Sequence, residues 1–255
     1  MDTITNPTAN ELIALLDHAN GTRRRQAALA LGGLRDPAVA PALVAHLRAE
    51  TPGCGVHEDL TWATVQHIDE ALPGVLAMLT DEDPHIRRTG AHVLSKVGNP
   101  DHADHLAPLV ADPDADVAIK AYRALATTGQ RHAHKALAVL AARLGDGDEL
   151  QRDALTTAFQ RFGADSAPVL AEALSSSDAV VRAHAADALG YLGADAVAAT
   201  EALTVAACDA DPDVRIAAVS ALGQIGEPAA KALTSLAGSP DPVVARIAGH
   251  FLPGH

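Results

Sequence analysis

Residues capable of chemistry gather in one stretch of this 255-residue chain, 51–70, which reads TPGCGVHEDLTWATVQHIDE. We expect a helix over 56–70, on which His57, Glu58 and Trp62 share a broad face, because positions three or four apart are neighbours on a helix. Imidazole and carboxylate groups bind transition metals, and the same pair can act as acid and base. His57 and Glu58 are therefore the candidate catalytic residues, although the pattern does not assign a catalytic role to either.

A metal site at this helix needs more than one histidine and one glutamate. The candidate metal ligands are His57, Glu58, His67 and His92. The alternative is a polar helix start, in which the carboxylate of Glu58 interacts favourably with the positive end of the helix dipole. The sequence therefore leaves room for a divalent metal at this helix but predicts no cofactor.

A group of cations forms the second candidate site, in a chain whose formal net charge is −13. Arg88 and His92 lie four positions apart on one expected helix, and Lys120 and Arg123 lie on the next. Together with Trp62 they could form a pocket for a carboxylate, a phosphate or an acidic peptide. The alternative is ordinary pairing with the abundant acidic side chains. We take these five as the candidate ligand- or partner-binding residues.

The elements that carry these candidates follow a repeated pattern. Copies read DPDVRIAAVSALGQIG at 211–226, DAVVRAHAADALGYLG at 178–193 and DPHIRRTGAHVLSKVG at 83–98. The leading Asp suits a helix N-cap, Pro suits the first helical position, and the closing Gly suits a left-handed C-cap. A shorter apolar helix precedes each copy, as at 167–174. One such hairpin cannot bury its apolar stripe alone, so the pattern predicts stacked hairpins in an α-solenoid.

Other positions of the repeat have expected roles of their own. Val214, Ala218 and Leu222 recur at helical spacing and are expected to make a buried stripe. His184 and Tyr191 are expected to face Asp187. An arginine recurs in the copies, and each is expected to pair with a loop aspartate of an adjacent unit: Arg87, Arg152, Arg182 and Arg215.

The pattern D-P-x-V-R-x-x-A-x-x-A-L-G-x-I-G resembles the HEAT-repeat family, in the short form typical of phycobilisome-lyase-like proteins. The resemblance implies an all-α fold, a right-handed superhelical α-solenoid of about eight helical hairpins. It divides the chain into an N-terminal tail over 1–9, a single solenoid over 10–252 and a C-terminal tail over 253–255. The family includes protein-binding scaffolds, chromophore lyases, a di-iron hydroxylase of deoxyhypusine and DNA glycosylases, so the fold does not give the function. The hydroxylase uses several His-Glu pairs, whereas this chain has only His57-Glu58.

Composition excludes several classes of protein. A surface as acidic as this one repels phosphate backbones, which disfavours nucleic-acid binding. No run of 18 uncharged apolar residues is present, so we expect no membrane partner. Cys54 and Cys208 are far apart and form no disulfide framework, which favours a reducing, cytoplasmic location.

The sequence therefore favours a scaffold that binds a protein segment or an acidic ligand on the concave face of units two to four. The first alternative is a metal-dependent or cofactor-handling enzyme with its site at the atypical helix over 56–70. The second is a nucleic-acid-processing protein of the HEAT type. Whether the protein is an enzyme stays open, but no GxSxG, HExxH, GxGxxG or Walker sequence supports catalysis.

Overall fold

The computed structural model describes residues 7–252, and every regular element in that range is a helix. The predicted all-α solenoid is confirmed. The chain forms two compact units, of which the first ends at Leu109 and the second begins at Val110. A single uninterrupted solenoid over 10–252 stays a prediction.

The two predicted tails cover 1–9 and 253–255. Residues 1–6 and all of 253–255 lie outside the described part of the chain. The first helix begins at Ala9, and the hydroxyl of Thr8 caps it by accepting a hydrogen bond from the backbone N–H of Glu11.

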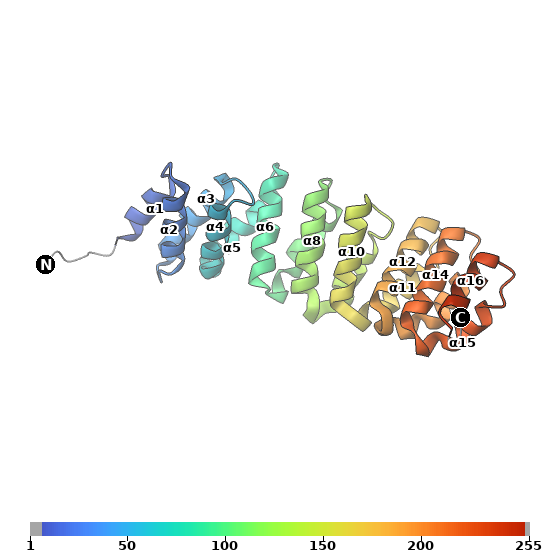
Figure 1. Cartoon of the computed structure of the whole chain (residues 1–255). Helices are drawn as coiled ribbons and strands as arrows, with labels where there is room; N and C mark the ends of the chain where they lie inside the picture. Colours follow the sequence, from blue (N-terminus) through green and yellow to red (C-terminus); the bar gives the residue numbers. More distant parts are fainter. Residues whose placement is uncertain (1–6, 253–255) are drawn as a thin grey trace. The chain divides into compact units, whose positions relative to one another are not determined.

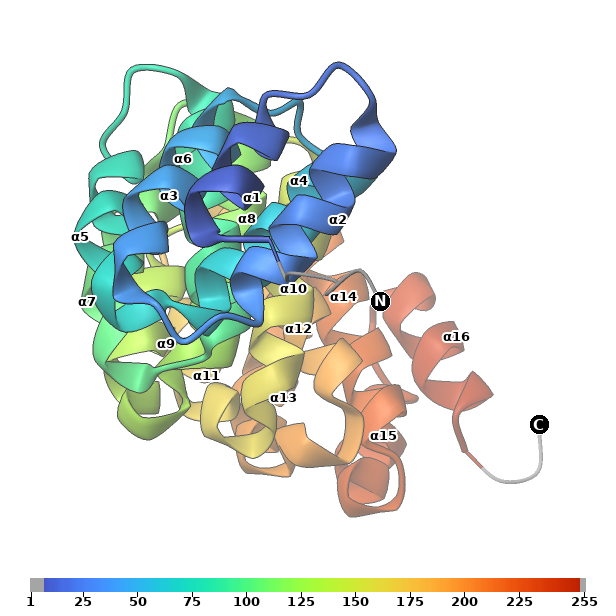
Figure 2. The ribbon, with the colours of Figure 1, turned by 90° about the vertical axis from the view of Figure 1, so that its left-hand side faces the viewer.

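The first unit alternates shorter and longer helices in two layers. The longer helices α2, α4 and α6 lie side by side (Figure 1), and α3 and α5 lie on the opposite side of this unit from α2 and α4 (Figure 2). Its elements are α1 (Ala9–Leu16), α2 (Gly21–Gly32), η1 (Pro37–Val39), α3 (Ala40–Ala49), α4 (Gly55–Gln66), α5 (Ile68–Met78), α6 (Pro84–Val97), η2 (Pro100–His102) and α7 (Ala103–Leu106). A 3₁₀ segment, η3 (Ala107–Ala111), follows.

The second unit continues the alternation, with α8, α10, α12 and α14 side by side (Figure 1). Its elements are α8 (Ala115–Thr128), η4 (Gly129–His132), α9 (Ala133–Ala141), α10 (Glu149–Phe162), η5 (Gly163–Ser166), α11 (Ala167–Ala173), α12 (Ala179–Leu192), η6 (Gly193–Ala199), α13 (Thr200–Ala206), α14 (Pro212–Ile225), η7 (Glu227–Ala229), α15 (Ala230–Leu236) and α16 (Pro242–His250). The second helices of the hairpins, α2 to α16, number eight within residues 7–252, in agreement with the expected repeat count.

Each longer helix is built as the repeat predicts. At α14 the carboxylate of Asp211 accepts hydrogen bonds from the backbone N–H groups of Asp213 and Val214 at 2.9 and 3.3 Å. The predicted stripe is confirmed, since Val214, Ala218 and Leu222 are fully buried. The cap fixes where the helix begins, and the stripe fixes which face packs against its neighbours.

An arginine joins consecutive repeats, as predicted for Arg182. Its Nε and Nη2 atoms donate to the two carboxylate oxygens of Asp209, both at 2.8 Å, and its Nη1 donates to the carbonyls of Ser176 and Ser177 at 2.9 and 3.2 Å. One guanidinium therefore satisfies the loop before its own helix and the loop of the next repeat. The same pairing recurs as Arg24–Glu50 and Arg215–Asp241.

The helix predicted over 56–70 is wrong in its boundaries. The structure has α4 over Gly55–Gln66 and a separate helix, α5, that begins at Ile68. His67 joins them with φ −115° and ψ 31°, outside helical geometry. Its buried Nε2 lies 3.0 Å from the carbonyl oxygen of Leu31 in α2, a tertiary contact that stabilises the break. The segment itself contains no Gly or Pro that would mark the elbow.

Among the described helices, none combines the length and the apolar character that a membrane crossing requires.

Candidate functional site

His57 lies inside the first unit rather than on an open surface. Its side chain is only 2% exposed, and Nε2 is 3.2 Å from the hydroxyl oxygen of Thr89 in α6. Because that hydroxyl donates to the carbonyl of His85, it accepts from His57, so the proton sits on Nε2. The Nδ1 atom is buried without a hydrogen-bond partner in the described structure. Burial lowers the pKa of His57, which keeps the ring neutral.

The four predicted metal ligands do not gather at one point. Glu58 is exposed on α4, and its Oε2 lies 3.6 Å from Nε2 of His92. His67 instead bonds the carbonyl of Leu31 at the other end of α4. Residues 7–252 contain no group of three or more His, Cys, Asp or Glu side chains placed to hold a metal ion. The geometry therefore gives no support to metal chemistry at α4.

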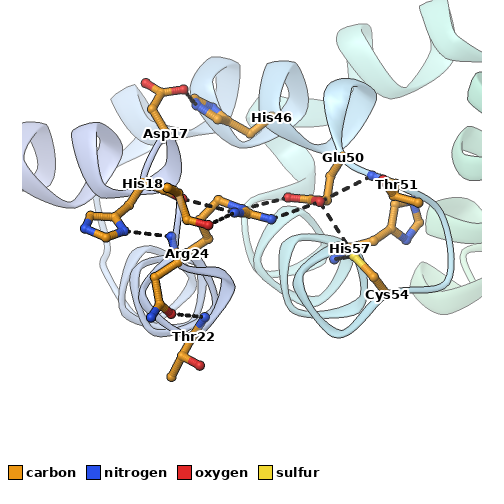
Figure 3. A network of polar contacts seen from close by, with 11 residues as sticks. Asp17, His18, Thr22, Arg24, His46, Glu50, Thr51, Cys54 and His57 are labelled. Carbon is orange, nitrogen blue, oxygen red and sulfur yellow. Dashed lines mark hydrogen bonds and ion pairs between the residues drawn. The ribbon is translucent and has the colours of Figure 1, made fainter.

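A polar network surrounds the start of α4 and accounts for its unusual sequence (Figure 3). Cys54 caps the helix, since its Sγ accepts from the backbone N–H of His57 at 3.4 Å. The same Sγ lies 3.7 Å from Oε1 of Glu50, which Arg24 holds at 3.0 and 3.3 Å. Burial alone would raise the pKa of Glu50, but Arg24, with the hydrogen bonds from Thr51 and Cys54, outweighs burial and the pKa is lowered. The network is a variant of the arginine pairing that joins repeats and has a structural role.

The predicted binding residues are divided between the two units. Trp62 is 43% exposed on α4, and its ring covers Gly32 of α2, where a Cβ atom would collide with it. Arg88 and His92 lie on α6 of the same unit. The other two, Lys120 and Arg123, lie on α8 of the second unit, so the five are not described as one surface. Their role in binding stays a prediction.

The second unit contains a cavity of about 570 Å³ between α10, α12 and α14. A smaller hollow of about 440 Å³ continues between α12 and α14 and shares Asp187 and Tyr191 with it. We call the two together the α10–α14 groove. The charged residues that line it are Glu149, Arg152, Asp153, Asp187, Asp211 and Asp213. With five carboxylates and one guanidinium, the groove carries a strongly negative potential.

Arg152 departs from the arginine pairing of the other repeats, and the pairing predicted for it is wrong. Within the described structure its side chain makes no hydrogen bond or ion pair, and it lines the groove instead. The reason is the start of α10. Asp148 has ψ −179°, against 121° at Asp178, and it forms a capping box with Gln151. This backbone turn differs from the one that presents two carbonyls to Arg182.

His184 fixes the loop before α10. It is 6% exposed, and its Nδ1 accepts a hydrogen bond from the backbone N–H of Gly145 at 3.0 Å. Its Nε2 lies 3.1 Å from the hydroxyl oxygen of Thr156, so the Nε2 proton completes the second bond. Burial lowers the pKa of His184 and keeps the ring neutral. Gly145 has φ +84°, a left-handed conformation that favours glycine. The carbonyl-bearing loop is thus held by α12 and not by Arg152.

Two carboxylates on the other side of the groove lack a cation. Asp187 and Asp213 form no ion pair within residues 7–252. Asp187 is exposed to solvent on one side, but partial desolvation against the groove raises the pKa of its carboxyl, and the nearby Asp213 carboxylate adds to the shift. Tyr191, one helical turn after Asp187, is 66% exposed beside them. This half of the groove offers negative charge next to an open aromatic ring.

Sequence reasoning found part of this groove and missed the rest. His184, Tyr191 and Asp187 do line one cavity, as their spacing on the helix predicted. The unpaired state of Arg152 was missed, because it sits at the repeat's own arginine position. A signal was present in the GDGD sequence over 145–148, which stands where other copies read SSSD (175–178) or CDAD (208–211) and which provides two left-handed glycines.

Comparisons with known families agree with the repeat pattern. The family of HEAT repeats matches residues 61–126 and 167–252, and the PBS lyase HEAT-like repeat matches residues 23–49. The two ranges matched by the HEAT-repeat family together cover more than half of the chain. No curated protein matches the sequence.

Solved structures share the fold at low sequence identity. A chain from the Kap95p–RanGDP structure is 12% identical, with TM-score 0.60 over 95% of this chain and 40% of its own. A chain from the structure of microtubule plus-end tracking by XMAP215, CLIP-170 and EB1 is 18% identical, with TM-score 0.58 over 69% of this chain and 88% of its own. A chain from the complex of CpcE and CpcF of phycocyanin lyase from Nostoc sp. PCC7120 is 20% identical, with TM-score 0.44 over 99% of this chain and 98% of its own. The first two show the α-solenoid fold; the third carries no further weight.

Proposed function

Because this chain belongs to the HEAT-repeat family, we propose that it is a scaffold whose second unit binds a segment of another protein in the α10–α14 groove. Stacked helical hairpins offer extended concave surfaces for partners. Kap95p, whose structure shares the fold, binds RanGDP. The groove lies on α10, α12 and α14, the second helices of their hairpins.

The unpaired guanidinium of Arg152 is the observation that supports this function. The corresponding arginines Arg24, Arg182 and Arg215 are each held by a carboxylate and two carbonyls. A guanidinium without such partners inside a cavity is free to bond an external group. The groove is also open enough to admit a chain segment, since Tyr191 and Val180 at its wall are 66% and 51% exposed.

Catalysis has weaker support. The candidate pair at α4 is split between a buried ring, His57, and an exposed carboxylate, Glu58, and neither residue lines the α10–α14 groove. In the groove itself the histidine, His184, uses both ring nitrogens in hydrogen bonds to Gly145 and Thr156. The His184 ring therefore has no nitrogen free to move a proton, and the His57 ring is buried away from solvent.

Site-specific photo-crosslinking tests the proposed function. A photoreactive phenylalanine analogue replaces Tyr191 in the groove or, as a matched control, Val205 on α13, which is 71% exposed and lines neither hollow. We expect a discrete protein adduct at Tyr191 in cells that produce the protein, lost when Arg152→Glu is added, and no such adduct at Val205. Equal labelling at both positions, or an adduct only at Val205, would reject the groove as the binding site.

A further inference from the structure

The side of the α10–α14 groove formed by α12 and α14 has the composition of a cation site. Asp187 and Asp213 line the same cavity and repel each other, and no cation of the described chain pairs with either. The ring of Tyr191 lies one turn from Asp187 with two thirds of its surface open. Carboxylates attract a cation by charge, and the face of an aromatic ring adds a cation–π contribution.

We propose that Asp187, Asp213 and Tyr191 bind a lysine or arginine side chain of the partner's segment. This inference rests on the proposed function and adds the chemical class of the segment, which is basic. A metal ion is a poorer occupant, because residues 7–252 contain no group of three or more suitable ligands. Two carboxylates and a ring suit an ammonium or guanidinium group, which needs fewer ligands and gains from the aromatic face.

The rest of the groove fits the main chain of such a segment. Beyond Tyr191 the hollow of about 440 Å³ is lined by small or polar residues, among them Gly190, Ser220 and Gln224. On the opposite side Arg152 offers guanidinium donors to a carbonyl or carboxylate of the same segment. Arg152 lies on α10, beside the carboxylates of Glu149 and Asp153, whereas Asp187 and Asp213 lie on α12 and α14, so the guanidinium and the Asp187–Asp213 pair mark different sides of the groove.

Protonation of Asp187 opposes the bound cation. Its pKa is raised, because partial desolvation in the groove and the Asp213 carboxylate disfavour the charged form. A bound ammonium or guanidinium stabilises the carboxylate and lowers this pKa, so binding releases protons under acidic conditions. Affinity for a basic segment therefore falls as the pH decreases through the range in which Asp187 takes up its proton.

An NMR titration of the full chain tests the inference. The probes are two synthetic peptides of equal length, one with lysine at every third position among Gly and Ser, the other with glutamine in place of each lysine. We expect the lysine peptide to shift the amide signals of Asp187, Tyr191 and Asp213 in a saturable, salt-sensitive manner, and the glutamine peptide to leave them in place. Asp187→Asn with Asp213→Asn lowers the affinity about tenfold. The control Glu201→Gln, with Asp165→Asn, removes the same charge from exposed positions outside the groove and leaves it unchanged.

The outcomes separate the two proposals. Equal shifts with both peptides, no shift with the lysine peptide, or an affinity unchanged in the Asp187→Asn, Asp213→Asn variant each overturns the cation site. If an adduct still forms at Tyr191, the groove binds its partner by other chemistry and the proposed function stands. If no adduct forms there, the proposed function fails whatever the peptides do.

Discussion

Replacement of His184 by alanine tests how the groove is held together. The ring bonds Gly145 in the loop before α10 through Nδ1 and Thr156 in α10 through Nε2, at 3.0 and 3.1 Å. A typical hydrogen bond contributes about 1 kcal/mol net. Loss of the buried ring, only 6% exposed, adds a transfer and cavity cost of roughly 1–2 kcal/mol. We expect His184→Ala to lower the unfolding free energy by about 2–4 kcal/mol at neutral pH.

The cost of His184→Ala depends on pH in a direction that the structure fixes. Burial lowers the pKa of His184 in the folded protein below its value of about 6.5 in the unfolded chain. The stability that the neutral ring contributes is therefore complete above that unfolded value and is lost as the pH falls towards the folded pKa. One proton changes the unfolding free energy by at most about 1.4 kcal/mol per pH unit. The gap between wild type and variant should narrow below about pH 6.5.

Urea unfolding followed by circular dichroism at several pH values measures this gap. An unchanged dependence on urea concentration shows that the same cooperative unit unfolds in both proteins. The other histidines whose pKa is lowered by burial, His57 and His102, are present in both and cancel in the difference. A gap that is constant or widens as the pH falls would refute the neutral hydrogen-bonded ring. A cost below about 0.5 kcal/mol at neutral pH would refute the two hydrogen bonds.

Four further substitutions test the repeat architecture and the departure from it at Arg152. Leu189→Ala empties a fully buried site and should cost roughly 2–5 kcal/mol of unfolding free energy in urea; a near-neutral result would place Leu189 outside the core. Arg182→Met should lower the unfolding free energy by about 1–2 kcal/mol in the same assay, because the Arg182 side chain is hydrogen-bonded. Arg152→Met should lower it by less than about 0.5 kcal/mol, because the Arg152 side chain has no such bonds in the described structure. Similar costs for the two variants would contradict the loss of pairing at Arg152. Gly32→Ala drives a Cβ into the Trp62 ring and should cost about 1–3 kcal/mol with a shift in Trp62 fluorescence, whereas an unchanged spectrum would place the ring elsewhere.

The sequence determined the repeat and what each repeat buries. Periodic Asp caps, apolar stripes such as Val214 to Leu222 and closing glycines are local signals, and local hydrogen bonds with helical spacing are sufficient to satisfy them. For the same reason the positions of His184 and Tyr191 relative to Asp187 followed from spacing on one helix. The sequence predicts the relative positions of residues that lie on the same helix.

Tertiary structure decided what happens between helices. The elbow at His67 depends on a carbonyl of α2, 36 positions away, and the state of Arg152 depends on a loop that His184 holds from α12. The sequence made His67 a candidate metal ligand, and it assigned Arg152 the consensus pairing because Arg152 occupies the arginine position of the repeat. Contacts between segments distant in the chain carry no periodic signature, because each is made once. Contacts of this kind form the groove, so its position follows only from the tertiary structure.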